Sequence, residues 1–457
     1  MKQLFALGIE KLAMGGFGIA YFNSKAIFVP YTAPGDVVDV NITHERKSHA
    51  FGRVLRYVSR GEAFCQPECS AFGSEVPCGG CDWLLLDYAS QLKHKQALVA
   101  ELFTPFVGSA LISPTLPSPQ SKHYRNKVFM PVGKDAVSGK ITYGIYSRWT
   151  HSIVPHEACA NHPPVFDALA KRIMQFCTKA KVLPYNEAQH RGNLRHIGFR
   201  SSADGSEILV VLVTLSGKLP FSGLLVKQLT AEFPQVKGIV QNINREHGNI
   251  ILGAEDKILY GVNYIYDKLG GLNFRINYRS FWQINTGTME LIMDAIRAQI
   301  GPKARVLDAF SGIGAIGLCL ANEVEHVSLL EEIPEAIEDA KANAEMNGIN
   351  NVSFYTGKCE ELLPEVLVAQ KPDIVIADPP RSGIDANSLQ VILLSGIKKL
   401  VYVSCAPMTL ARDIKILLAE GAYKLDSLQS FDMFPNTWHI ECLAVLSKQY
   451  TNPTKKL

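Results

Sequence analysis

Apolar runs and helical patterns alternate through the second half of the chain. Five short strand-like runs are separated by segments whose apolar residues recur at helical spacing. Such alternation is typical of crossover units, which build a parallel sheet with helices on both faces. Two further runs, 424–431 and 439–446, have no long helix between them, so we expect an antiparallel pair at the end of the sheet. The five runs are 305–308, 327–330, 352–355, 374–377 and 400–403.

The first 58 residues have a different pattern, in which short β-rich runs are broken by glycine and proline turns. This pattern predicts an OB-like β-barrel over residues 1–58. Residues 1–60 hold eight Lys or Arg against four acids, and Tyr21, Phe22 and Phe51 are candidate exposed aromatics. A basic, aromatic barrel is typical of an oligonucleotide platform, and an ordinary solvated barrel is the open alternative.

Residues 59–270 mix cysteine clusters with a helical pattern at 87–103 and strand runs at 207–214 and 238–243. We therefore expect a central α+β domain over this range. The remaining residues, 271–457, are expected to form a Rossmann-like α/β domain with a seven-stranded sheet.

Composition limits the class of protein. With 457 residues, 47% of them apolar, two or three domains are expected. The net charge of +3 means that a polyanion would be met by local patches rather than by bulk charge. Apolar runs fall short of the roughly 20 residues of a membrane helix, and Glu10 and Lys11 interrupt the stretch nearest to a signal peptide. We expect a cytoplasmic protein with no membrane partner and no stable protein partner.

A glycine-rich turn, 312–317, follows the first strand of the alternating region and opens a helix. Such a turn can bind a dinucleotide or S-adenosylmethionine, or it can be a structural turn that binds no ligand. Asp308, ahead of the glycines, would repel a pyrophosphate but could pair with the methionine amino group. Glu331, at the end of the next strand, could accept both ribose hydroxyls. The two acids together favour S-adenosylmethionine.

Asp378 and two prolines follow the fourth strand, where parallel sheets place their ligand-binding loops. The prolines hold the backbone extended and aim the Asp378 carboxylate into the crevice. Amino-directed nucleic-acid methyltransferases carry an aromatic residue after such prolines, and this chain has Arg381. An exocyclic amine is therefore disfavoured as methyl acceptor, although a proline-rich turn with a solvated Asp remains an alternative.

Cys405 ends the fifth strand, next to a helix beginning near Met408 whose N-terminus would favour a thiolate. A thiolate that adds to carbon 6 of a flipped-out uracil makes carbon 5 nucleophilic toward a sulfonium methyl. The carbon 5 proton must then leave. Glu441 stands in an otherwise apolar run, where burial would raise its pKa toward that of a useful base. Taken singly, each residue also has a structural explanation. Cys405 can be a small buried core residue, and Glu441 can be a solvent-facing strand residue.

Three motifs together resemble the RNA 5-methyluridine methyltransferase family: 378–383, 404–413 and 439–441. The resemblance extends over almost the whole chain, because the barrel is similar to that family's TRAM domain. Segments 124–127 and 193–196 resemble its central domain, and 281–285 resembles its cofactor-facing segment. This chain departs from the family's motifs at two positions. It has Ala406 where the family commonly has Asn, and Ser311 where the family commonly has Cys.

The resemblance implies roles for single residues. Cys405 would be the nucleophile and Glu441 the proton acceptor. The pocket for cofactor and substrate would be lined by Gln283, Phe310, Glu331 and Asp378.

Cys65, Cys69, Cys78 and Cys81 fall within 17 residues, with metal-ligand spacing. Spacing alone leaves zinc, an iron-sulfur cluster and unliganded thiols open. The family resemblance implies a 4Fe-4S cluster held by Cys69, Cys78, Cys81 and the distant Cys159, with Cys65 as the alternative to Cys69.

The sequence thus predicts an S-adenosylmethionine-dependent enzyme that makes 5-methyluridine in RNA. Resemblance to the ribosomal members favours 23S ribosomal RNA, and transfer RNA is the alternative. Two hypotheses from other classes are an RNA-binding assembly factor without catalysis and a nicotinamide-dependent oxidoreductase. Cys405 and Glu441 disfavour both.

Overall fold

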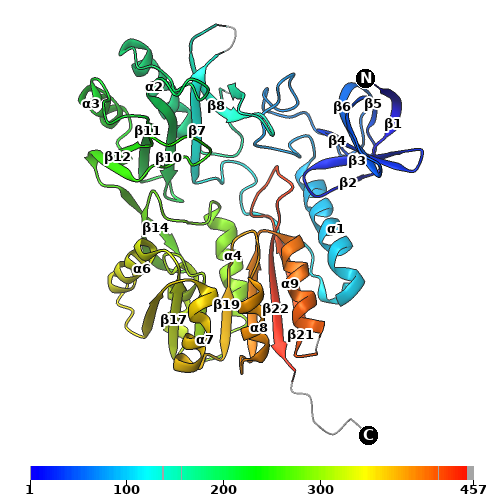
Figure 1. Ribbon diagram of the computed structural model, residues 1–457, viewed down its shortest axis with the longest axis vertical. Helices are drawn as coiled ribbons and strands as arrows, with labels where there is room; N and C mark the ends of the chain where they lie inside the picture. The colour runs from blue at the N-terminus through cyan, green and yellow to red at the C-terminus, as the bar shows by residue number, and fades with distance from the viewer. Residues whose placement is uncertain (1, 136–137, 156, 420, 450–457) are drawn as a thin grey trace. The chain divides into compact units, whose positions relative to one another are not determined.

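The computed structural model describes residues 2–135, 138–155, 157–419 and 421–449, which form two compact units (Figure 1). Each unit has its own sheet system. Unit 1 comprises Met1–Gln91, Gln120–Ile265 and Pro435–Trp438, and unit 2 comprises Leu92–Pro119, Tyr266–Phe434 and His439–Leu457.

A six-stranded sheet opens unit 1, in the order β1-β5-β6-β4-β3-β2. Contact between β1 and β3 curls this sheet around a small apolar core that includes Val29, Val38 and Val40. The predicted N-terminal barrel is thereby confirmed as a β domain. Its strands are β1 (Gln3–Gly8), β2 (Lys11–Leu12), β3 (Phe17–Phe22), β4 (Lys25–Pro30), β5 (Val37–Glu45) and β6 (His49–Ser59).

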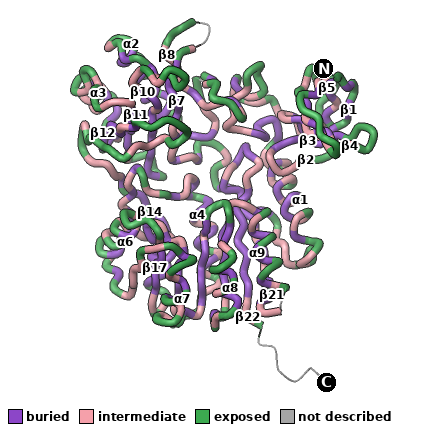
Figure 2. The backbone as a smooth tube through the Cα atoms, viewed as in Figure 1, coloured by how far each residue is buried: buried purple, intermediate pink, exposed green. Residues whose placement is uncertain are grey.

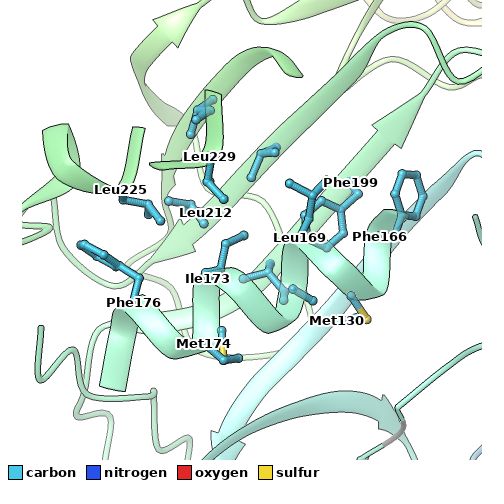
Figure 3. Close-up of a cluster of buried hydrophobic side chains, with 14 of the residues drawn as sticks. Met130, Phe166, Leu169, Ile173, Met174, Phe176, Phe199, Leu212, Leu225 and Leu229 are labelled. Atoms are coloured by element: carbon cyan, nitrogen blue, oxygen red, sulfur yellow. The ribbon is translucent and has the colours of Figure 1, made fainter. Parts of the chain in front are cut away.

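The second sheet of unit 1 has seven strands, in the order β13-β12-β11-β10-β7-β8-β9. Helix α2 (Pro164–Lys179) places Phe166, Leu169 and Ile173 on one face, since they recur at helical spacing, and this face packs on the sheet (Figure 3). Helix α3 (Ser222–Glu232) adds Leu225 and Leu229 to the same core. The strands are β7 (Lys127–Lys134), β8 (Ile141–Tyr146), β9 (Ile153–Pro155), β10 (Leu194–Ser201), β11 (Ile208–Thr214), β12 (Val236–Ile243) and β13 (Glu255–Gly261).

Unit 2 contains the predicted seven-stranded sheet, in the order β18-β17-β16-β19-β20-β22-β21. The first five strands are parallel, and β22 is antiparallel to both β20 and β21, so the predicted antiparallel end is confirmed. Figure 2 shows β22 buried along most of its length. The strands are β16 (Arg305–Ala309), β17 (His326–Glu331), β18 (Val352–Thr356), β19 (Ile374–Ala377), β20 (Lys399–Ser404), β21 (Tyr423–Phe431) and β22 (Glu441–Lys448).

Helices connect the parallel strands of unit 2. From β16 the chain moves outward to β18 and then returns to β19, so right-handed crossovers place the outgoing and returning helices on opposite faces. This reversal between β16 and β19 leaves a crevice at the carboxyl ends of the strands. The outgoing helices are α5 (Ala315–Leu320) and α6 (Pro334–Met346), and the returning ones are α7 (Cys359–Gln370), α8 (Ala386–Leu394) and α9 (Pro407–Ala419).

Further elements complete unit 2. Helix α1 (Tyr88–Val107), which matches the helical pattern at 87–103, begins where the Asp87 carboxylate accepts the Ser90 N–H at 2.8 Å. None of the helices in the described residues combines the length and apolarity that a membrane span requires. The remaining elements are β14 (Tyr264–Leu269), β15 (Leu272–Asn277), α4 (Thr286–Arg297) and the 3-10 turns η1 (Ser109–Leu111) and η2 (Ala321–Glu323).

Candidate active site

Strand register in unit 2 brings Cys405 and Glu441 face to face. Ser404, the last residue of β20, is paired with Cys442 of the antiparallel strand β22. The next pair outward along the same register is Cys405 and Glu441. Two residues 36 positions apart in sequence are therefore neighbours at one edge of the sheet.

The parallel strands align a second group beside the first. Strand β16 pairs with β19 on one side and with β17 on the other. The residues directly after the last pairs therefore lie next to one another: Phe310, Asp378 and Glu331. Phe310 has a φ of 65°, which an aromatic residue rarely adopts. Such strain is common where a side chain is held for function. The structure thus gathers Phe310, Glu331 and Asp378 at the crevice.

The glycine turn is tied to Glu331. The two oxygens of this half-buried carboxylate accept the N–H groups of Gly312 and Ile333, each at 2.9 Å. Gly312 and Gly314 have φ values of 55° and 81°, which only glycine adopts without strain. A carboxylate has further lone pairs, so Glu331 can still accept ribose hydroxyls.

Asp308 braces the glycine turn through one of its carboxylate oxygens. The residue is buried, and its carboxylate accepts the Gly317 N–H at 2.8 Å, within the packing of the glycine turn. Burial raises the pKa of Asp308 to about 8, and the carboxylates of Asp378 and Glu331 act in the same direction. Its Oδ1 atom has no hydrogen-bond partner among the described residues, so pairing with a methionine amino group stays a prediction.

Asp378 and Gln283 approach each other from different elements. The Gln283 amide donates a hydrogen bond to the Asp378 carboxylate at 3.2 Å. Burial raises the pKa of Asp378 to about 7, and the bond from Gln283 opposes the shift. Gln283, whose segment precedes α4, is therefore brought to the same crevice as the loop after β19.

The expected lowering of the Cys405 pKa by the helix N-terminus is wrong. Helix α9 begins at Pro407, close to the predicted start, but burial raises the thiol pKa to about 11 and the Glu441 carboxylate adds to the rise. Arg381 opposes this shift through its charge and a hydrogen bond to the sulfur. Sequence reasoning treated Arg381 only as a missing aromatic, because its approach to Cys405 depends on the fold.

Glu441 is 1% exposed, and its Oε1 atom has no hydrogen-bond partner among the described residues. Burial raises its pKa well above the ordinary value, as the sequence predicted, and the nearby Asp378 carboxylate adds to the rise. A buried carboxyl oxygen without a hydrogen-bond partner destabilises the fold and has no structural benefit. Glu441 is thus a candidate acid or base.

A buried lysine fixes the turn that leads to Glu441. Lys95 of α1 donates to the Asp432 carboxylate at 2.5 Å and to the carbonyls of Phe434 and His439 at 3.0 and 2.8 Å. Lys95 and Asp432 are fully buried. No sequence pattern signals this pair, because Lys95 lies in an ordinary amphipathic helix.

Replacing Lys95 with methionine is expected to lower the free energy of unfolding by about 3–5 kcal/mol, because the Asp432 charge would stay buried without its partner. Chemical denaturation measures the loss, and the exposed Lys93→Met on the same helix is the matched control. The double variant Lys95→Met/Asp432→Leu should recover part of the stability. No recovery in the double variant would rule out the unpaired carboxylate as the cause.

Four cysteines of unit 1 line one cavity of about 40 Å³: Cys69, Cys78, Cys81 and Cys159. Cys65 does not line it, and its sulfur lies 3.7 Å from the Leu84 carbonyl. Among the described residues, no group of three or more His, Cys, Asp or Glu side chains is arranged to hold a metal ion. Four thiols around one cavity match the donor set of a zinc site as well as that of an iron-sulfur cluster.

Polar groups around this cavity suit sulfur ligands. The Asn161 amide donates to the Cys81 sulfur at 3.2 Å. Burial would raise the pKa of Cys159, but a hydrogen bond and the charge of His162, together with backbone hydrogen bonds from Asn161 and His162, outweigh burial and lower the pKa to about 7. Burial raises the pKa of Cys78 to about 11. Donors aimed at sulfur stabilise the thiolate form that a cluster requires.

Comparison with known proteins adds independent information. The profile of the tRNA (Uracil-5-)-methyltransferase family matches residues 87–449, and that of the TRAM domain of tRNA (uracil(54)-C(5))-methyltransferase matches residues 7–53. An uncharacterized RNA methyltransferase of Oceanobacillus iheyensis is 37% identical over 457 residues, covering 99% of this chain and 98% of the relative. One from Nostoc sp. is 34% identical over 448 residues, covering 97% and 96%.

A solved structure resembles the whole fold. The Pyrococcus abyssi tRNA (uracil-54, C5)-methyltransferase, in complex with S-adenosyl-L-homocysteine, superposes with a TM-score of 0.78 at 25% identity. The match covers 97% of this chain and 100% of that chain.

Proposed function

The chain belongs to the tRNA (uracil-5-)-methyltransferase family, and from this premise we propose that it makes 5-methyluridine in 23S ribosomal RNA. As a member it is an S-adenosylmethionine-dependent RNA (uracil-5-)-methyltransferase, with an α/β methyltransferase fold and an N-terminal TRAM domain. The residue roles and the identity of the RNA belong to the proposal.

Cys405 is the nucleophile in this proposal. Its sulfur forms a bond to carbon 6 of the uracil, and the electrons of the carbon 5–carbon 6 double bond move toward carbon 5. The base must be flipped out, because stacking hides the face that the sulfur attacks. Arg381 holds a positive charge beside the sulfur and so favours loss of the thiol proton.

Glu441 takes the proton from carbon 5 once that carbon carries the new methyl group. The electrons of the broken C–H bond restore the ring double bond, and the Cys405 sulfur leaves carbon 6. Bound S-adenosylmethionine supplies the electrophilic methyl group. Glu331 would hold its ribose, and Gln283, Phe310 and Asp378 would line the cofactor and base.

The single observation that carries this proposal is the β20–β22 register, which sets Cys405 opposite Glu441. A nucleophile and a base on facing positions of two strands can reach the same ring, one at carbon 6 and the other at carbon 5. Neither an assembly factor nor an oxidoreductase needs this pair.

Nucleoside analysis of a deletion strain tests the substrate. Loss of 5-methyluridine from 23S ribosomal RNA, restored by the wild-type gene and not by Cys405→Ala, is the expected result. Retention of every 5-methyluridine in 23S ribosomal RNA would contradict the assignment.

Transfer RNA is the second candidate substrate. The observation in its favour is the likeness to the Pyrococcus abyssi enzyme, whose name gives tRNA uracil-54 as its target. Loss of 5-methyluridine from transfer RNA alone, in the same deletion strain, would establish this candidate instead.

We also propose that Cys69, Cys78, Cys81 and Cys159 hold a 4Fe-4S cluster. The support is the shared cavity and the donor aimed at the Cys81 sulfur. The four cysteines belong to unit 1 and the proposed catalytic residues to unit 2, so the role proposed for the cluster is to fix the fold of these loops.

Serine variants separate the two candidates for the first cluster ligand. Anaerobically purified Cys69→Ser is expected to lose iron and acid-labile sulfide, whereas Cys65→Ser should keep both at the wild-type level. Elemental analysis with visible absorption measures the difference. Cluster loss in Cys65→Ser with retention in Cys69→Ser would exchange the two assignments.

The raised pKa of Cys405 predicts a pH dependence. Below its pKa of about 11 the Cys405 thiol is mostly protonated, and the fraction of reactive thiolate grows about tenfold with each pH unit. Adduct formation should therefore rise about tenfold per pH unit above neutrality. Arg381→Gln removes the opposing charge and should slow the reaction roughly tenfold at a given pH. Lys424→Gln, which removes an exposed charge on β21, is the control. A flat pH profile would contradict the raised thiol pKa.

A further inference from the structure

A hollow of about 710 Å³ lies within unit 1, and none of the residues that line it belongs to the candidate active site. Residues of β3, β4, β5 and β6 form one side of it, and segments 73–77 and 147–149 contribute the other. Of the aromatics that the sequence suggested for RNA binding, only Phe51 lines this hollow.

An exposed indole marks the hollow. Trp149 is 78% exposed, and its backbone has a φ of 59°, a strained conformation for a large side chain. Its ring stacks on Phe17 with centroids 5.7 Å apart and planes at 10°. Phe17 in turn meets Phe51 edge-on at 5.5 Å. The fold thus holds a flat aromatic surface open to solvent.

Charged groups surround this aromatic surface. The Arg148 guanidinium lies 5.4 Å from the Trp149 ring centroid and forms an ion pair with Asp82. Exposed Arg53 donates one N–H to the Glu75 carbonyl at 3.1 Å, and a guanidinium has five such donors. The Glu75 side chain is the carboxylate that lines the hollow.

The cysteine loops shape one wall of the hollow. Segment 73–77 lies between Cys69 and Cys78, and the Tyr31 hydroxyl donates to the Cys78 carbonyl at 3.4 Å. The Gly79 N–H donates to Tyr146 at 3.0 Å, and a Cβ at Gly79 would lie 3.1 Å from the Arg148 nitrogen. This close approach sets the turn that carries Trp149.

We propose that this hollow binds an unpaired nucleotide of the substrate RNA, with its base stacked on Trp149 and its phosphate near Arg53. The proposal rests on the proposed function, since an RNA substrate supplies the occupant. Every nucleobase has a flat face that can stack on an indole, and a guanidinium can bind the adjoining phosphate. A base-paired duplex cannot offer that face, so the site selects single strands. The residues that line it are different from those proposed to contact the methylated uracil.

Fluorescence anisotropy tests the proposal with two probes, a fluorescein-labelled single-stranded oligo(A) decamer and its duplex with oligo(U). Trp149→Ala is expected to weaken single-strand binding roughly tenfold and to leave duplex binding unchanged. Trp149→Phe should keep most of the affinity because it keeps a ring. The matched control is Phe221→Ala, which removes an aromatic that is 68% exposed, also has a positive φ and lies outside the hollow.

Unchanged oligo(A) affinity in Trp149→Ala, as expected if the hollow docks a protein, would overturn the proposal. An equal loss for the duplex would do the same. Methylation of 23S ribosomal RNA from a deletion strain is measured in parallel. If the wild-type enzyme fails to methylate this RNA while Trp149→Ala still loses oligo(A) binding, the proposed substrate is wrong. The nucleotide site in the hollow is then still supported.

Discussion

Replacing Cys405 with alanine is expected to abolish methylation, with a rate loss of at least about 10³-fold. Without the sulfur no bond forms at carbon 6, so carbon 5 stays too weak a nucleophile to take the methyl group. Transfer of a tritiated methyl group to RNA measures the rate, and denaturing gels show whether any protein–RNA adduct forms.

Two measurements keep the Cys405 result interpretable. Cys405→Ala should bind S-adenosylmethionine and melt as the wild type does, because Cys405 is only half-buried. Cys359→Ala, which shortens a buried cysteine at the start of α7, is the matched control and should methylate normally. Methylation by Cys405→Ala at more than a tenth of the wild-type rate would remove Cys405 from its role.

Replacing Glu441 with glutamine is expected to trap the enzyme on its RNA. Addition of Cys405 and methyl transfer remain available, but the carbon 5 proton has no acceptor. Turnover should fall about 10²- to 10⁴-fold, while a methylated protein–RNA adduct that survives denaturation accumulates. Glutamine keeps the shape of the buried side chain, so the fold should tolerate it.

The two variants therefore have opposite signatures on one denaturing gel. Glu332→Gln, on the exposed surface after β17, is the control and should show neither the adduct nor the loss of turnover. A folded, cofactor-binding Glu441→Gln protein without an adduct would show that Glu441 acts before methyl transfer, and the role of proton acceptor would then pass to another group.

Local patterns predicted the strand elements of unit 2 well. The inner parallel strands are short apolar runs, because a strand covered on both faces buries most of its side chains, as β19 does. The antiparallel end followed from the missing helix between β21 and β22. The same patterns put Cys405 at the end of one strand and Glu441 within another, and the register of one sheet then brought them together.

Other properties depend on groups that meet only after folding. The Cys405 pKa is set by burial and by Glu441 and Arg381, which come from two other segments, so reasoning from the following helix α9 alone gave the wrong direction. The hydrogen bond from the Gly317 N–H to Asp308 likewise exists only in the folded glycine turn. The exposure and strain of Trp149 likewise follow from tertiary packing against the cysteine loop, which no local pattern shows.

Mass spectrometry of a trapped adduct tests the central claim most directly. Uracil that carries fluorine at carbon 5 has no proton there to lose, so wild-type enzyme with S-adenosylmethionine and fluorouridine-substituted RNA should stall after methyl transfer. After nuclease and protease digestion, the account predicts a methylated fluorouridine nucleotide on the peptide that contains Cys405. A nucleotide on another of the ten cysteines, or no adduct from active enzyme, would contradict it.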